Sequence, residues 1–162
     1  MHDTVAFTEE GTPLGVLDAQ CWARDPEKIN EFRNIKARVP IELKESMKWI
    51  RSFRKLAEIQ RLCPDTMLVS IGDRESDIYE LLAEALIDPN GPKLLVRSER
   101  TRFRKVENEY LWDHMLNLNI AGKVALEIPR SGSRKARTAI VNIRFSKVEI
   151  SPTKNSKKEP PL

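Results

Sequence analysis

Long apolar runs are missing from this chain of 162 residues. No stretch approaches the roughly 18 uninterrupted apolar residues of a membrane-spanning helix, and the first residues lack the basic start and apolar run of a secretory signal. These absences argue against a membrane protein and favour the cytoplasm. The length suits one modest hydrophobic core, which indicates one domain or a part of one.

Cysteine and histidine are also scarce, with two of each. Cys21 and Cys63 lie far apart and have no Cys or His at metal-binding spacing, and His2 and His114 have no partners at ligand spacing either. We therefore expect two buried, reduced thiols rather than a zinc site or a disulfide bridge.

Charged residues, in contrast, make up 32% of the chain, and the two signs are unevenly distributed. Residues 1–96 contain 13 basic and 17 acidic residues, a net charge of −4, whereas residues 97–162 contain 15 basic and 7 acidic residues, a net charge of +8. The basic part is either a surface for a polyanion or an ordinary solvated face, and charge alone does not decide between them.

A hairpin and a helix are predicted in the amino-terminal part. The β-type runs at residues 4–8 and 13–22 flank the turn sequence EEGTP, which predicts a β-hairpin. Residues 23–40 are charged and lack periodicity, so they predict a surface loop. An amphipathic helix is predicted over residues 45–62 from the spacing of its apolar side chains, which are Trp49, Ile50, Phe53, Leu56 and Ala57.

A strand, a helix and a second strand follow in the sequence. Residues 67–71 form a continuous apolar run whose length suits a strand buried on both faces. Residues 78–86 repeat apolar side chains at helical spacing, and residues 93–98 (KLLVRS) predict another strand. This order implies a βαβ unit with two parallel strands, and therefore an α/β protein.

An acidic segment, GDRESD at residues 72–77, directly follows the first of these strands. Active sites of open α/β sheets gather at the carboxyl ends of strands, and Asp73 stands at such an end. Its carboxylate is either a loop acid or a ligand for a hard divalent cation such as Mg²⁺. We expect Gly72 to permit a tight exit from the strand and Glu75 to be a loop acid. Asp77 is expected to cap the next helix or match its dipole.

Two families end a strand in a similar way. The pattern G-D-x-x-x-D in SIGDRESDI is similar to a metal-binding motif of dehalogenase-type phosphatases. Those enzymes also need a nucleophilic Asp-x-Asp, and the chain contains none. A phosphatase is therefore the weaker alternative.

The closer match is to the DDE transposases of bacterial insertion sequences, namely the insertion-sequence-four family with its Tn-five-type enzymes. GDRESDIYELL resembles the signature around the second of that family's three catalytic acids. PLGVLDAQCWARD is similar to the strand and loop after the first acid, KESMKW resembles the start of the helix before the second, and LLVRSERTR looks like the strand and basic loop after it. These four matches occur in the family's order over residues 2–105.

This resemblance implies a partial RNase H-like mixed sheet with flanking helices over residues 1–118. It also implies the start of a β-rich insertion at residues 119–150 and a cut loop or tail at residues 151–162. The residues themselves also predict β-structure in this insertion. Apolar residues alternate on both sides of the basic turn PRSGSRKAR at residues 129–137, as expected for a β-hairpin.

The resemblance also implies the chemistry. Cutting and joining DNA strands are phosphoryl transfers that two Mg²⁺ ions support, and Mn²⁺ can replace them. Asp73 corresponds to the second acid and a shared metal ligand. The first acid is expected to precede residue 1 and the third to follow Leu162, so we expect an internal fragment that is inactive alone. The complete bacterial enzyme is expected to act as a homodimer on double-stranded DNA.

Several basic residues are candidate DNA contacts. Arg97 corresponds to a phosphate-binding arginine of the family, and its planar fork suits a bidentate grip. Arg74 contacts a phosphate or pairs with Glu75 or Asp77. Glu99 stands where the family often has a basic residue, so Arg100 or Arg102 is expected to substitute.

The basic turn at residues 129–137 is a further candidate. Its cations form either a patch for the DNA backbone or a solvated turn, and they are Arg130, Arg134, Lys135 and Arg137. A non-catalytic DNA-binding remnant is therefore a further alternative to an enzyme.

Overall fold

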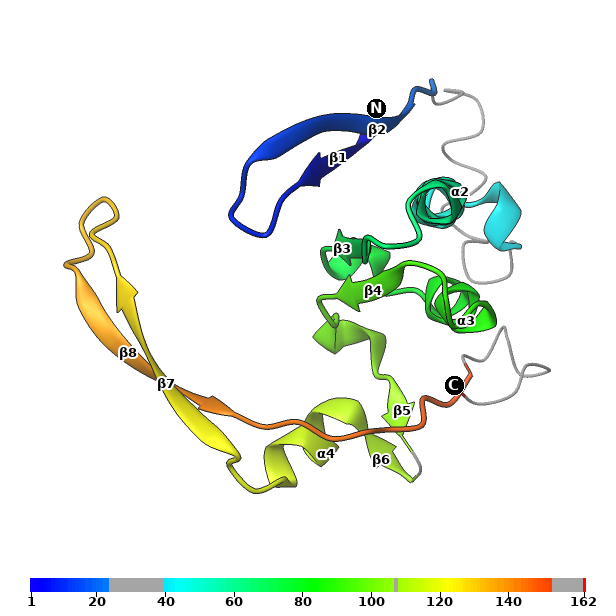
Figure 1. Cartoon of the computed structure of the whole chain (residues 1–162). Coiled ribbons are helices and arrows are strands. Elements are labelled where there is room, and N and C mark those ends of the chain that lie inside the picture. Colours follow the sequence, from blue (N-terminus) through cyan, green and yellow to red (C-terminus); the bar gives the residue numbers. More distant parts are fainter. Residues whose placement is uncertain (24–39, 107, 153–161) are drawn as a thin grey trace. The chain divides into compact units, whose positions relative to one another are not determined.

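The structure is a computed structural model that describes residues 1–23, 40–106, 108–152 and 162. These residues form a mixed α/β chain with three α-helices and four separate two-stranded sheets (Figure 1). The predicted loop at residues 23–40 and the tail at residues 151–162 fall mostly outside the described residues. None of the described helices is long and apolar enough to cross a membrane.

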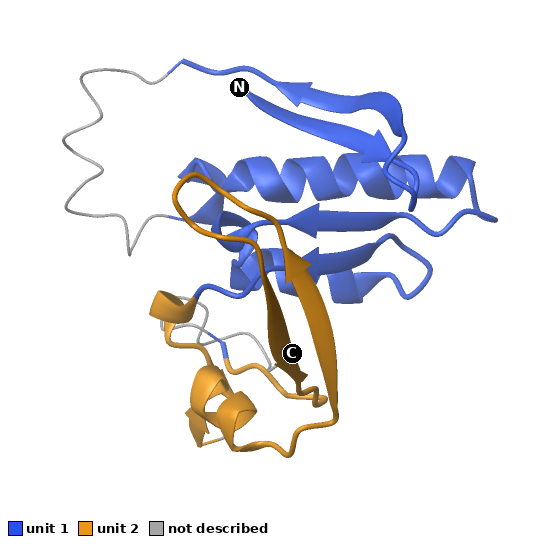
Figure 2. Cartoon of the chain, turned by 90° about the vertical axis from the view of Figure 1, so that its left-hand side faces the viewer, with its two compact units in different colours: residues 1–99, 152–160, 162 blue, residues 100–151, 161 orange. Residues whose placement is uncertain are grey.

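The chain divides into two compact units, drawn in different colours in Figure 2. Unit 1 comprises residues 1–99 with the described residues 152 and 162, and unit 2 comprises residues 100–151. The division falls earlier than the expected boundary at residue 118. Residues 100–118 belong to unit 2 because Val106 pairs with Ile150 and the Ser151 N–H donates to the Lys105 carbonyl at 2.9 Å.

Unit 1 begins with the predicted hairpin, which the structure confirms. Strands β1 (His2–Phe7) and β2 (Pro13–Gln20) are antiparallel, and the turn closes with a 2.9 Å hydrogen bond from the Thr8 N–H to the Thr12 carbonyl. Gly11 has a φ of 87°, a conformation that L side chains rarely adopt. The Gln20 amide nitrogen donates to the Ser52 hydroxyl at 2.9 Å, which ties the hairpin to the following helix.

Helix α2 (Met47–Leu62) confirms the amphipathic pattern and follows a short 3-10 turn, η1 (Ile41–Leu43). Its apolar face packs on α3 (Tyr79–Ile87). The core of unit 1 consists of two side chains from α2 and two from the α3 segment, namely Ile50, Phe53, Ile78 and Leu81. Trp49, which lies on the same face of α2, is only partly buried against this core.

Strands β3 (Val69–Gly72) and β4 (Lys93–Val96) form the predicted parallel pair, with α3 as the crossover. The prediction that the first strand is buried on both faces is wrong. Val69 is 42% exposed and Ile71 is 74% exposed, because the helices cover one face of the pair among the described residues. The described residues form a mixed α/β arrangement, but β1–β2 and β3–β4 stay separate rather than joining in the partial mixed sheet that the resemblance implies.

Unit 2 starts with small elements and ends in a long hairpin. The small elements are η3 (Arg100–Arg102), β5 (Lys105–Val106), β6 (Glu109–Tyr110) and α4 (Leu111–Asn117). Strands β7 (Gly122–Ile128) and β8 (Arg137–Ile143) are antiparallel with Val124 opposite Val141, which confirms the predicted hairpin.

Both cysteines are free, as predicted, but they are not both buried. Cys63 is partly buried at the end of α2, whereas Cys21 is exposed directly after β2. The expectation of burial was wrong for Cys21, because β2 ends one residue earlier.

Candidate functional site at the ends of the parallel strands

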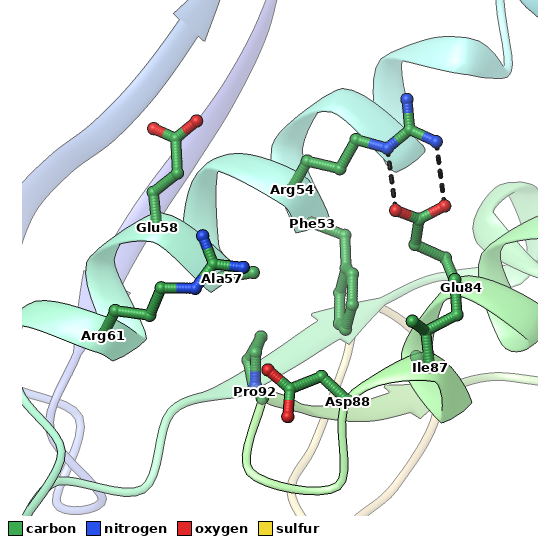
Figure 3. A pocket seen from close by; sticks show the side chains of 11 residues that line it. Phe53, Arg54, Ala57, Glu58, Arg61, Glu84, Ile87, Asp88 and Pro92 are labelled. Atoms are coloured by element: carbon green, nitrogen blue, oxygen red, sulfur yellow. Dashed lines mark hydrogen bonds and ion pairs between the residues drawn. The ribbon is translucent and has the colours of Figure 1, made fainter.

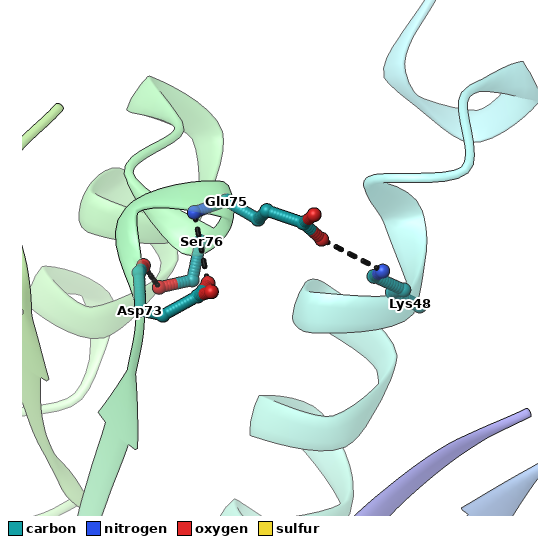
Figure 4. Close-up of polar contacts among 4 residues, drawn as sticks. All are labelled: Lys48, Asp73, Glu75 and Ser76. Carbon is teal, nitrogen blue, oxygen red and sulfur yellow. Dashed lines mark hydrogen bonds and ion pairs between the residues drawn. The ribbon is translucent and has the colours of Figure 1, made fainter. Parts of the chain in front are cut away.

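Asp73 lies immediately beyond β3 and caps the 3-10 turn η2 (Arg74–Ser76). Its Oδ1 atom accepts a hydrogen bond of 2.9 Å from the Glu75 N–H (Figure 4). Its carbonyl accepts two more, at 3.0 Å from the Ser76 N–H and at 2.6 Å from the Ser76 hydroxyl. The turn is therefore held from within, and the Asp73 side chain is exposed to solvent.

Gly72 is required by this turn because the fully buried Ser76 packs directly against it. A Cβ atom at Gly72 would lie 2.7 Å from the Ser76 Cβ and closer still to its Oγ. The same Cβ would lie 3.7 Å from the Trp49 ring, so the helix also approaches this strand end. The tight strand exit that the sequence indicated at Gly72 is therefore a matter of close packing rather than of a positive φ.

Arg97 takes the corresponding place on β4. Gly72 and Val96 are the last paired residues of the two strands, and the Arg97 N–H donates to the Gly72 carbonyl at 3.1 Å. Asp73 and Arg97 therefore emerge from adjacent strands at the same edge, and both side chains are exposed. The structure brings these two predicted site residues together.

Arg74 has a partner that the sequence did not suggest. Its Nε atom lies 3.8 Å from Glu99 Oε2, and the Arg74 side chain is 64% exposed. Glu75 instead approaches Lys48 of α2, with 3.2 Å between Nζ and Oε2 (Figure 4). The unusual Glu99 thus has a structural use, because its carboxylate faces Arg74 across the strand ends.

Asp77 lies two residues before α3, so it is not the N-cap residue of that helix, and its match to the helix dipole stays a prediction. Ile78 is the residue before the helix and makes no side-chain cap. Asp77 is 3% exposed, and its Oδ2 atom accepts a 2.8 Å hydrogen bond from the Glu99 N–H. This carboxylate therefore ties the β3 turn to the loop after β4.

A metal ion needs more ligands than this edge provides. No three His, Cys, Asp or Glu side chains gather as a metal site within the described parts of the chain. Asp73 fits one position in such a site, because it is exposed and only its Oδ1 atom accepts from the turn. Carboxylate oxygen is also the ligand type that Mg²⁺ prefers.

The remaining predicted cations belong to unit 2. Arg100 lies over the Trp112 ring, with 5.9 Å between the guanidinium carbon and the ring centroid, and Arg102 is exposed on the same 3-10 turn. The basic turn residues are all exposed at the tip of the β7–β8 hairpin; they are Arg130, Arg134, Lys135 and Arg137. Ser131 and Arg134 pair at this tip, and Gly132 has a φ of 59°.

A cavity of about 220 Å³ lies between α2, α3 and the segment before β4 (Figure 3). Arg54 and Glu84 meet at its edge through two hydrogen bonds of 2.8 and 2.9 Å. Phe53 and Pro92 line its interior. None of the predicted site residues lines this cavity, and its position had no signal in the sequence, since it depends on how the two helices pack.

The chain matches no protein-family model, and a search of curated proteins found no significant match. Functional assignment therefore depends on the motifs and on the geometry at the strand ends.

Proposed function

We propose that this chain carries the second catalytic carboxylate, Asp73, of a bacterial DDE transposase of the insertion-sequence-four family. The observation that supports this most is the parallel β3–β4 pair, from which Asp73 and Arg97 emerge side by side at the carboxyl ends. This is the edge at which α/β proteins place their active sites. The resemblance of GDRESDIYELL and LLVRSERTR to the family covers the same two strand ends.

In the proposed reaction water attacks a DNA phosphodiester and releases a 3′ hydroxyl. That hydroxyl then attacks a second phosphodiester and displaces its 3′ oxygen as the leaving group. Mg²⁺ or Mn²⁺, when bound, would activate the attacking oxygen and stabilise the leaving one. Asp73 would supply one carboxylate ligand. Arg97 would hold a phosphate through its planar fork, and Arg74, whose contact to Glu99 is long and exposed, can turn toward the same phosphate.

One carboxylate cannot hold two metal ions, so under this proposal Asp73 works with acids from further segments. The described strands leave room for that arrangement. The β1–β2 and β3–β4 sheets each have unpaired edges among the described residues. Both sheets pack near α2: His2 of β1 meets Trp49, and Leu94 and Val96 of β4 pack against the core that includes Ile50 and Phe53. Added strands can therefore complete an RNase H-like mixed sheet, and the complete enzyme would act as a homodimer on double-stranded DNA.

The test is duplex DNA binding in the presence of EDTA, Mg²⁺ or Mn²⁺. We expect either metal to raise the affinity of the wild type, because an ion can join Asp73 to a phosphate, and we expect no nicking by this chain alone. Asp73→Ala should lose the increase caused by metal, whereas Arg97→Ala should weaken binding in all three conditions. An increase that persists in Asp73→Ala would contradict the proposal. Nicking that depends on Asp73 would contradict only the expectation that this chain is inactive alone.

A second candidate function is DNA binding without catalysis. The observation in its favour is the cluster of exposed cations at the β7–β8 tip, which can contact phosphates without reading sequence. This function predicts duplex binding that falls steeply with salt and does not respond to metal or to Asp73.

A further inference from the structure

Unit 2 exposes three aromatic rings within residues 103–112. Phe103 is 67% exposed, Tyr110 is 43% exposed and Trp112 is 38% exposed. The rings of Phe103 and Tyr110 meet edge to face, with 5.7 Å between their centroids. We refer to these three residues as the aromatic cluster.

Two short elements hold the cluster in place. Lys105 and Val106 of β5 pair with Tyr110 and Glu109 of β6, and the Leu111 N–H donates to the Arg104 carbonyl at 2.8 Å. Phe103 therefore lies on the segment that faces Tyr110 and the first turn of α4. The φ of Phe103 is 48°, which is in the left-handed region that a bulky residue rarely adopts. Because the ring is exposed, burial of the side chain does not offset the cost of this backbone conformation.

Cations lie over two of these rings. Arg100 is 5.9 Å from the centroid of Trp112, and Lys105 Nζ is 5.9 Å from the centroid of Tyr110. Four of the six residues from 100 to 105 are basic and none is acidic. The nearest acids in sequence are Glu99 and Glu107. Glu99 lies 3.8 Å from Arg74 in unit 1, and Glu109 approaches His114 at 2.8 Å. The cluster thus combines flat apolar faces with positive charge.

This combination fits a strand of DNA whose bases are not paired. Aromatic side chains stack on exposed base faces, and adjacent cations bind the phosphates between them. In a duplex both faces of each base are covered by neighbouring bases, so the rings could not stack there. A membrane surface fits less well, because α4 has only seven residues and carries Asp113 in its first turn.

We infer that the aromatic cluster, with Arg100 and Lys105, binds an unpaired stretch of DNA. The choice of DNA as the polyanion rests on the proposed function. The stacking contact itself does not, because it needs neither Asp73 nor a metal ion. Failure of the transposase proposal would therefore leave this site unaffected.

The experiment measures fluorescence polarisation of a labelled oligo(dT) of 12 nucleotides in EDTA. The wild type should bind this probe more tightly than it binds the oligo(dA)·oligo(dT) duplex of equal length or inorganic polyphosphate. Phe103→Leu and Trp112→Leu keep apolar side chains but remove the flat rings, and each should weaken oligo(dT) binding about tenfold. Trp22→Leu is the matched control, since Trp22 is 41% exposed in unit 1, and it should bind as the wild type does.

A second readout keeps the inference testable if a leucine variant folds poorly. Trp112→Phe retains a stacking ring, so it should still bind oligo(dT). Binding should quench tryptophan fluorescence in the wild type, and this quenching should be smaller in Trp112→Phe. Asp73→Asn should change neither result. Equal binding of oligo(dT) and polyphosphate, or unchanged binding by both leucine variants, would overturn the inference. So would sedimentation with phosphatidylserine vesicles that oligo(dT) does not compete away, since it would indicate a membrane surface.

Discussion

At the scale of single residues, the acidic segment after β3 contains side chains with different tasks. Asp73 is exposed and caps its own turn, whereas Asp77 is buried and joins two loops. Glu75 makes an exposed ion pair with Lys48. Part of this acidic segment therefore has a structural role. Among the described contacts at the strand end, Asp73 is the exposed carboxylate that has no ion-pair partner.

Gly72→Ala should destabilise the protein by about 1–3 kcal/mol, because the new methyl group would overlap Ser76. Urea denaturation would measure the loss. Gly122→Ala is the matched control, since a Cβ there meets nothing within 4 Å. Equal stability of the two variants would show that Ser76 does not pack against Gly72 as described.

Asp77→Ala should cost about 1–3 kcal/mol, because it leaves the Glu99 N–H without the acceptor that it has in the folded chain. Glu75→Ala, two residues earlier, should cost no more than about 1 kcal/mol, since the ion pair with Lys48 is largely exposed. The free energies of unfolding of the two variants can be compared directly. A larger loss for Glu75→Ala would contradict the role assigned to Asp77.

At the scale of elements, the contact between α2 and α3 combines the apolar core with one ion pair. Ile50 and Phe53 of α2 pack with Leu81 of α3, and Arg54 holds Glu84 through two hydrogen bonds. Both helices were predictable because their apolar spacing is local. The ion pair was not, because Arg54 and Glu84 are 30 residues apart and meet only after the helices pack.

This ion pair should make stability depend on pH. The hydrogen bonds from Arg54 lower the pKa of Glu84 below its usual value of 4.5. A lowered folded-state pKa gives stability that is present above pH 4.5 and is lost as the pH falls through the folded-state pKa. Solvent screening limits the effect to about 0.5 kcal/mol, because Arg54 is more than half exposed. The difference in free energy of unfolding between wild type and Glu84→Gln should therefore shrink from pH 7 to pH 3. A difference that stays constant over this range would contradict the stabilising role of the ion pair.

The β7–β8 hairpin should give duplex binding its dependence on salt. If its four tip cations each displace a counterion, affinity should fall on the order of 100-fold between 50 and 200 mM salt. The quadruple alanine variant of Arg130, Arg134, Lys135 and Arg137 should flatten this slope. Arg51→Ala with Lys55→Ala, on the exposed side of α2, is the control and should leave the slope as in wild type. An unchanged slope in the quadruple variant would show that DNA binds elsewhere.

At the scale of the whole molecule, the sequence predicted the order of strands and helices better than their surroundings. Alternation and helical spacing are local, so both hairpins, α2, α3 and the parallel pair were predictable. The exposure of Val69 and Ile71 was not predictable, because it depends on what covers the second face of the sheet. The positions of Asp73 and Arg97 at adjacent strand ends followed from the parallel order, whereas the approach of Arg74 to Glu99 depends on loop geometry.

The central claim is that the ends of β3 and β4 form one edge of a metal-dependent DNA site. Paramagnetic broadening of amide NMR signals by Mn²⁺ tests it most directly, because broadening falls steeply with distance from the ion. The signals of residues 73–76 and 97–98 should broaden first in the wild type and stay sharp in Asp73→Asn. Broadening centred on other carboxylates, such as Glu109 beside His114, or the same broadening in Asp73→Asn, would contradict the account.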